Sequence, residues 1–200
     1  MQVDPAKLID AIAGCLIDNV QELTELDAAI GDADHGLNMR KGGEALRAEM
    51  AAFKSATLPE ALQLAGSILA TTVGGAAGPL YGSLLMTMGK SIGPDPDLAD
   101  VSKALAAGVE AMERLGKAEA GQKTMLDVWK PVSRLVAREG ATVQSVRTLA
   151  REAAVATIPM EARRGRASYL GERSRGHMDP GARSSELLIW AVADALEFGQ

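Results

Sequence analysis

Apolar residues recur every three or four positions through most of this 200-residue chain. That period places them on one face of an α-helix. The first run comprises Leu8, Ile9, Ile12, Leu16, Val20 and Leu23, and further runs span about residues 38–53, 57–69, 80–92, 98–115, 125–137, 142–156 and 184–198. No stretch shows the period-two alternation of a strand bounded by hairpin turns. The sequence therefore predicts an all-α fold, an antiparallel bundle or barrel of about eight amphipathic helices.

The composition limits the classes of protein to which the chain can belong. Hydrophobic residues make up 47% and charged residues 24%, as in a folded globular protein rather than a disordered one. The net charge of −5 argues against a nucleic acid or an anionic membrane as a partner, because both attract basic surfaces. No linker or shift in composition divides the chain, so we expect a single domain over residues 1–200.

The N-terminal residues and the cysteine count indicate the cellular compartment of the protein. The chain does not open with a basic stretch and an apolar run, and no apolar run reaches the length of a membrane span. Cys15 is the one cysteine, so an internal disulfide is impossible, which fits a reducing compartment. We therefore expect a cytoplasmic protein in which Cys15 is a small buried hydrophobe.

An acidic segment with two glycines separates the first two helical runs. It carries three aspartates, a histidine and an asparagine, namely Asp27, Asp32, Asp34, His35 and Asn38. Carboxylates are the ligands that Mg2+ and Ca2+ prefer, and glycines let the chain turn so that the acids converge. We interpret the segment as a divalent metal site for nucleotide phosphates. The alternative is that Asp32 or Asp34 only caps the next helix. An EF-hand is excluded, because Gly43 stands where its loop needs glutamate.

A glycine-rich segment at residues 74–78 precedes the helical run at 80–92. Backbone N–H groups at such a place form an anion-binding nest that the helix dipole strengthens. The alternative is a tight turn between helices that needs glycine. Gly89-Lys90-Ser91 resembles the end of a Walker A loop, but Leu84 stands where that pattern needs glycine and no strand precedes it. We therefore reject a P-loop.

Residues 163–183 are polar, glycine-rich and nearly free of apolar periodicity. They combine arginines and hydroxyl groups with His177 and the turn signal Asp179-Pro180-Gly181. Guanidinium groups bind phosphate in a bidentate manner. Long polar loops are uncommon in compact domains unless they have a function. Since alternate loops of an up-and-down bundle share one end, we expect the irregular segments to form one site there: residues 27–38, 74–82, 116–124 and 163–185.

The chain carries four motifs that together resemble one known family, the nucleotide-binding L subunit of dihydroxyacetone kinase. They occur in the order GDADHGLNM, GGAAGPLYG, GQKTMLD and GRASYLGERSRGHMDPGA, and the resemblance covers essentially the whole chain. It implies a barrel of eight antiparallel helices that binds ADP or ATP at one end through two Mg2+ ions. It also implies phosphoryl transfer to a small ketose on a separate K subunit, with bound ADP rephosphorylated by a phosphohistidine-bearing M subunit of the phosphotransferase system. A homodimer is left open.

The resemblance also assigns roles to individual residues. The family's metal ligands match Asp27, Asp32 and Asp34. Its nucleotide contacts match His35, Gly36, Leu37, Asn38, Gly74, Gly75, Ala76, Ala77, Gly78, Gly116, Met125, Arg166, Asp179, Pro180 and Gly181. No residue of this chain is assigned as a catalytic nucleophile or base, because the acceptor hydroxyl and its base are expected on the partner.

Three positions depart from the family's pattern. Ala77 stands where the family usually has serine, Ala33 where it often has glycine, and Gln122 where it commonly has aspartate. Other functions therefore stay open beside the first. One is a subunit of a triose or tetrose kinase that uses free ATP. Another is a non-catalytic regulatory module that senses nucleotide, which the loss of the serine hydroxyl favours. A Ca2+-binding structural domain is the last.

Overall fold

The computed structural model describes residues 3–197, and over this range helices are the only regular secondary structure. The elements are α1 Pro5–Asp18, α2 Val20–Ile30, α3 His35–Ala48, α4 Met50–Phe53, α5 Leu58–Thr72, α6 Ala77–Ser91, α7 Leu98–Gly116, α8 Leu126–Val136, α9 Val143–Ala156, the 3-10 helix η1 Arg166–Ser174, and α10 Pro180–Glu197. The predicted all-α fold is confirmed. Within the same range, every helix is too short or too polar to cross a lipid bilayer.

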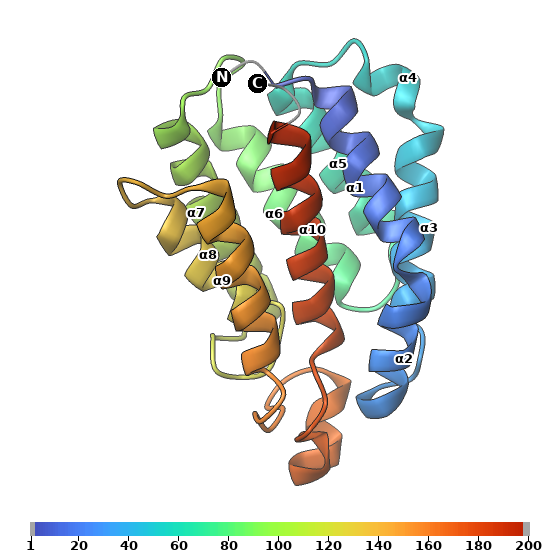
Figure 1. Cartoon of the computed structure of the whole chain (residues 1–200). Coiled ribbons are helices and arrows are strands. Elements are labelled where there is room, and N and C mark those ends of the chain that lie inside the picture. Colours follow the sequence, from blue (N-terminus) through green and yellow to red (C-terminus); the bar gives the residue numbers. More distant parts are fainter. Residues whose placement is uncertain (1–2, 198–200) are drawn as a thin grey trace.

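Two breaks divide helices that the sequence predicts as continuous. Asn19 separates α1 from α2, where its side chain donates a hydrogen bond to the Cys15 carbonyl at 2.8 Å, and Glu49 separates α3 from α4. In Figure 1 the members of each pair still follow one another as one rod. Eight long helices and η1 remain if each pair is taken as one rod. The predicted starts of α3 near Asn38 and of α10 near Ser184 are each a turn too late.

The helices pack around an apolar core built mainly from leucine, isoleucine, valine, methionine and alanine. The α5 and α6 backbones approach so closely that a Cβ at Gly66 would lie 2.8 Å from the Gly82 carbonyl oxygen. Cys15 is half-buried against this core, and burial raises the pKa of its thiol to about 11. The thiol therefore stays protonated, as expected for a small hydrophobe.

Side-chain caps fix two helix starts that the sequence signals. The Asp4 carboxylate accepts hydrogen bonds from the N–H groups of Ala6 and Lys7 at the start of α1. Thr57 and Glu60 form a capping box at the start of α5. Figure 1 shows the α2–α3 connection, residues 117–125 and η1 at the same end of the bundle, opposite the start of α1 and the end of α10.

Candidate functional site

Five segments of the chain line one cleft at that end of the bundle, with a volume of about 240 Å³. Its walls come from the α2–α3 connection, the α5–α6 connection, residues 116–126, residues 164–167 and the start of α10. The lining includes most of the predicted site residues: Asp27, Asp32, Asp34, His35, Asn38, Gly74, Gly75, Ala76, Ala77, Gly116, Met125, Arg166, Asp179, Pro180 and Gly181. The structure thus brings together the polar segments that the sequence groups at one end.

Asp27 lies in the last turn of α2 and caps the helix that follows. Its Oδ2 accepts hydrogen bonds from the backbone N–H groups of Asp34 at 2.9 Å and His35 at 3.0 Å, and the residue is buried. Asp34 holds the N-cap position of α3, yet within the described chain its side chain makes no capping hydrogen bond. The alternative that Asp32 or Asp34 serves as the cap is therefore wrong, because Asp27 performs that role from the preceding helix.

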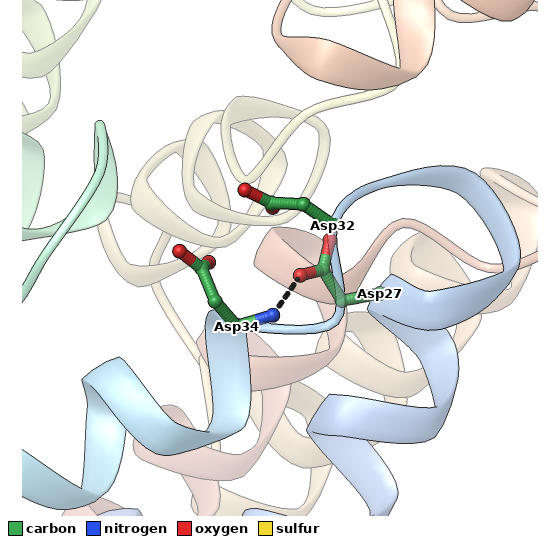
Figure 2. A group of neighbouring side chains, drawn as sticks. All are labelled: Asp27, Asp32 and Asp34. Carbon is green, nitrogen blue, oxygen red and sulfur yellow. Dashed lines mark hydrogen bonds between the residues drawn. The ribbon is translucent and has the colours of Figure 1, made fainter.

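Two small residues allow the acids to converge. A Cβ at Gly31 would lie 2.0 Å from Asp27 Oδ1, so glycine is needed to leave room for that carboxylate. Ala33 adopts the left-handed region at φ 61°, which costs a residue other than glycine about 1–2 kcal/mol. This turn directs the side chains of Asp32 and Asp34, on either side of Ala33, toward the same space (Figure 2).

The three carboxylates form a cluster that suits a divalent cation. One oxygen from each of Asp27, Asp32 and Asp34 lies within 4.8 Å of the others. Two oxygens on opposite sides of one Mg2+ are about 4.2 Å apart, so small side-chain rotations suffice to bring the three onto one ion. Asp27 is buried, Asp34 half-buried and Asp32 exposed. The cluster therefore opens from the bundle toward the cleft.

The ring of His35 joins α3 to α10. Its Nε2 lies 3.0 Å from Ser184 Oγ, and the ring also hydrogen-bonds the Pro180 carbonyl. Burial lowers the pKa of His35 from its ordinary value, while the charges of Asp27 and Asp34 oppose that shift. A neutral ring that donates to a carbonyl can accept from a hydroxyl at its other nitrogen. The ring is therefore engaged within the protein, and the nucleotide contact that the resemblance implies stays a prediction.

A buried hydroxyl network behind His35 escaped the sequence reasoning. Tyr81 of α6 has its hydroxyl 2.8 Å from Ser184 Oγ and 2.9 Å from Ser185 Oγ. Together with His35, these groups form a continuous hydrogen-bonded chain from α3 through α10 to α6. No local pattern signals the network, because its members come together only in the folded bundle.

The glycine-rich loop brings the start of α6 to the cleft. Gly75 has φ 66°, a left-handed conformation that glycine adopts without strain. A Cβ at Gly74 would lie 2.6 Å from Asn38 Oδ1, so the loop packs directly on that amide. Among the residues that the structure describes, α6 begins without a side-chain cap, and Ala76 and Ala77 line the cleft. An uncapped helix N-terminus offers free N–H groups to an anion.

Three residues of the predicted nucleotide site do not line the cleft. A Cβ at Gly36 would lie 2.1 Å from the Val20 carbonyl oxygen, and a Cβ at Gly78 would lie 2.1 Å from that of Val73. Close packing therefore accounts for both glycines. Leu37 is 41% exposed and outside the lining. A nucleotide contact for these three residues stays a prediction.

The segment that contains η1 carries two arginines to the cleft. Arg166 Nη2 lies 3.0 Å from Asp32 Oδ2. Arg164, which the sequence reasoning missed, donates a hydrogen bond to Gln122 Oε1 at 3.2 Å. The same amide oxygen accepts from the N–H of Glu119, so Gln122 links the arginine segment to residues 117–125. This segment therefore contacts both the acidic loop and the loop before α8.

Asp179-Pro180 starts a helix rather than only a turn. Asp179 Oδ2 accepts a hydrogen bond from the N–H of Ala182 at 2.7 Å, and the N–H of Asp179 donates to Thr157 Oγ1 at 3.0 Å. Burial raises the pKa of Asp179 to about 7, although the hydrogen bond from Ala182 opposes the rise. The predicted turn is thus corrected to a capped start of α10, and a nucleotide contact by Asp179 stays a prediction.

The sequence prediction also did not include the apolar wall of the cleft. Leu80, Met112 and Leu126 line it beside Met125. These residues belong to the helical periodicity of α6, α7 and α8, so a sequence pattern alone counts them as core. An apolar wall next to a few polar groups is the usual composition of a small-molecule site.

Clustered acids, an uncapped helix start and an apolar wall around one terminal cleft define an all-helical domain that binds a small molecule. The chain belongs to the DAK2 domain family, whose sequence model matches residues 29–194. The family predicted from the four motifs is confirmed.

Two relatives and a solved structure extend the comparison. The chain is 43% identical over 176 residues to the PEP-dependent dihydroxyacetone kinase 1, ADP-binding subunit DhaL, of Listeria innocua, covering 88% of this chain and 87% of that protein. It is 40% identical over 189 residues to the L-erythrulose 1-kinase of Mycolicibacterium smegmatis, covering 90% of this chain and 33% of that protein. The dihydroxyacetone kinase from C. freundii, solved in complex with AMP-PNP and Mg2+, has the same fold. It matches with a TM-score of 0.79 and 23% identity over 94% of this chain and 33% of that one.

Proposed function

We propose that this chain is the ADP- or ATP-binding subunit of a dihydroxyacetone-type kinase. It transfers a phosphoryl group from Mg2+-nucleotide to a small ketose on a separate K subunit, and a phosphohistidine-bearing M subunit rephosphorylates bound ADP. The observation that carries the proposal is the meeting of three carboxylates and the uncapped start of α6 in one cleft. The 43% identity to a protein named as an ADP-binding kinase subunit supports it. A single domain and a cytoplasmic location, both expected from the sequence, belong to the same proposal.

The ligand atoms of the acidic cluster are of the kind that magnesium prefers. Asp27, Asp32 and Asp34 offer oxygen ligands only, which Mg2+ prefers. The kinase that shares this fold was solved with Mg2+ and a nucleotide analogue. Bound Mg2+ neutralises charge on nucleotide phosphates, and we propose two ions shared by the three acids. Arg166, which pairs with Asp32, is placed to exchange that carboxylate for a phosphate oxygen.

The remaining walls suit the other parts of a nucleotide. Phosphoryl transfer depends on positioning and charge neutralisation more than on covalent chemistry by the protein. The N–H groups at Ala76 and Ala77 would hold phosphate oxygens at the start of α6. The apolar side chains of Leu80, Met112 and Met125 would receive the adenine ring. The acceptor hydroxyl and its base would come from the K subunit.

A kinase subunit that uses free ATP on a triose or tetrose is the second candidate. The 40% identity to an L-erythrulose 1-kinase favours it. Mass spectrometry of the nucleotide that copurifies separates the two, since retained ADP favours the phosphotransferase-dependent form and rapid exchange favours free ATP. A non-catalytic nucleotide sensor is the third candidate, supported by Ala77 in place of the family's serine. A sensor of that kind would support no ketose phosphorylation.

Reconstitution with a K subunit tests the proposal, with several small ketoses and with free ATP compared to a phosphotransferase donor. Asp32→Ala is expected to abolish nucleotide retention and to lower turnover about a hundredfold or more, with helicity unchanged. Asp95→Ala, at an exposed position in the α6–α7 connection, is the control and should keep wild-type activity. An Asp32→Ala protein that purified with nucleotide and turned over normally would show that the metal assignment is wrong.

A further inference from the structure

Lys123 is a buried lysine whose ammonium group is engaged by backbone carbonyls. Only 1% of the surface of Lys123 is exposed to solvent. The Nζ atom donates hydrogen bonds to the carbonyls of Thr157 at 2.8 Å, Met160 at 3.2 Å and His177, and the carbonyl of Ile158 also lies 3.5 Å away. An ammonium has three N–H donors. All three are therefore committed to the protein, and none is left for a ligand even though Lys123 lines the cleft.

These carbonyls belong to the two stems of one loop. Residues 161–176 extend beyond the ends of α9 and α10 and contain η1 with Arg166 (Figure 1). Thr157 and Met160 lie on the outgoing stem after α9, and His177 lies on the returning stem before α10. A single ammonium thus joins both stems to residues 117–125, from which Lys123 extends.

The other contacts between this loop and the bundle are a small apolar cluster, an exposed ion pair, and hydrogen bonds from the Arg163 N–H and the Arg164 side chain to Gln122. Its apolar attachment is a small cluster of two alanines and one leucine against one isoleucine, namely Ala162, Ala167, Leu170 and Ile30. The Arg166–Asp32 pair has side chains that are 68% and 35% exposed, and exposed ion pairs contribute little to stability. Hydrogen bonds from a buried charged group are stronger than those between neutral groups. The Lys123 contacts are therefore the principal attachment of the loop.

The backbone around Lys123 is fixed by a left-handed turn and by hydrogen bonds to Asp127. Its backbone is left-handed at φ 61°. The carboxylate of Asp127 accepts hydrogen bonds from the N–H groups of Gly121 and Thr124, which flank Lys123 in sequence. Burial lowers the pKa of Lys123, and the charge of Asp179 opposes that shift. The ammonium therefore projects from a fixed turn with a carboxylate close enough to stabilise its charge.

We propose that Lys123 is a positioning residue that holds residues 161–176 as a lid over the cleft. The inference rests on the proposed function, in which Arg166 of this lid faces the nucleotide phosphates. Without the ammonium, only the contacts of Arg163 and Arg164 with Gln122 still join the loop to residues 117–125, and the lid opens more often in the nucleotide-free protein. A nucleotide that needs the closed lid then binds more weakly, in proportion to the loss of the closed population.

Lys123→Met tests the proposal, with Lys117→Met as the matched control. Lys117 lies in the same loop and is also left-handed, at φ 47°, but it is exposed. The amides of Arg163 and Gly176, which donate to the Gln122 and Ile158 carbonyls, should exchange hydrogen about tenfold faster in nucleotide-free Lys123→Met. Calorimetry should show Mg·ADP binding weakened about tenfold. Lys117→Met should match the wild type in both measurements.

Two results would overturn the proposal. Exchange at the two stem amides that matches the wild type would show that Lys123 does not hold the lid. If exchange at these amides were faster but Mg·ADP binding matched the wild type, the loop would not act as a lid for the nucleotide. Should Lys123→Met fail to unfold cooperatively, Lys123→Gln, whose amide keeps two N–H donors, is measured under the same criteria. A wild-type protein that binds no Mg·ADP would refute the proposed function, whereas the exchange result is independent of nucleotide.

Discussion

Replacing Ala33 by glycine should stabilise this protein, although glycine usually destabilises. Ala33 sits at φ 61° between two acids of the cluster. The left-handed conformation costs an alanine about 1–2 kcal/mol. Glycine removes that strain but loses more backbone entropy on folding, which offsets about 0.5–1 kcal/mol of the gain. We expect Ala33→Gly to raise the free energy of unfolding by about 0.5–1 kcal/mol.

Ala28→Gly is the matched control for this substitution. Ala28 is exposed within α2, and a glycine inside a helix costs about 0.5–1 kcal/mol relative to alanine. The same chemical change should therefore have opposite signs at the two positions. Urea unfolding followed by circular dichroism, with EDTA present to keep cations off the acids, should separate the two variants by about 1–2 kcal/mol.

Equal destabilisation by the two glycines would refute this reasoning. It would mean that the chain between Asp32 and Asp34 does not hold a left-handed turn. The convergence of those two carboxylates on one space would then lose its structural basis.

Two further substitutions test the electrostatics of the site and its phosphate loop. The pKa of Asp179 is raised to about 7, so the stability contributed by its protonated form is full below about pH 4 and is lost as the pH rises through 7. Asp179→Asn should remove a fall in stability of up to about 1.4 kcal/mol per pH unit across that window, and an unchanged pH profile of urea unfolding would contradict this. Ala77→Ser should tighten Mg·ADP binding by up to about tenfold through an added hydroxyl, an idea that unchanged calorimetric affinity and turnover would remove.

The class of fold could be predicted because each amphipathic helix carries its pattern locally. The break at Asn19 could not, since the apolar period continues through it from Leu16 to Leu23. The early start of α10 could have been found. Asp179-Pro180 repeats the N-cap and proline signal of Asp4-Pro5, which marks α1 correctly.

Parts of the candidate site were visible in the sequence for a similar reason. Aspartates and glycines at 27–36 and glycines at 74–78 are locally unusual, so they attract attention without a fold. Lys123 gives no such signal, because a lysine in a glycine-rich polar segment is normally exposed. Its carbonyl partners lie 34 to 54 residues further along the chain. Only the folded bundle reveals that this lysine is buried and what it holds.

A crystal of the protein grown with ADP and Mn2+ tests the central claim most directly. Anomalous scattering should place manganese within about 2.2 Å of oxygens from Asp27, Asp32 and Asp34, with the diphosphate against the start of α6 at Ala77. Manganese bound elsewhere, with these three acids facing bulk solvent, would contradict the account.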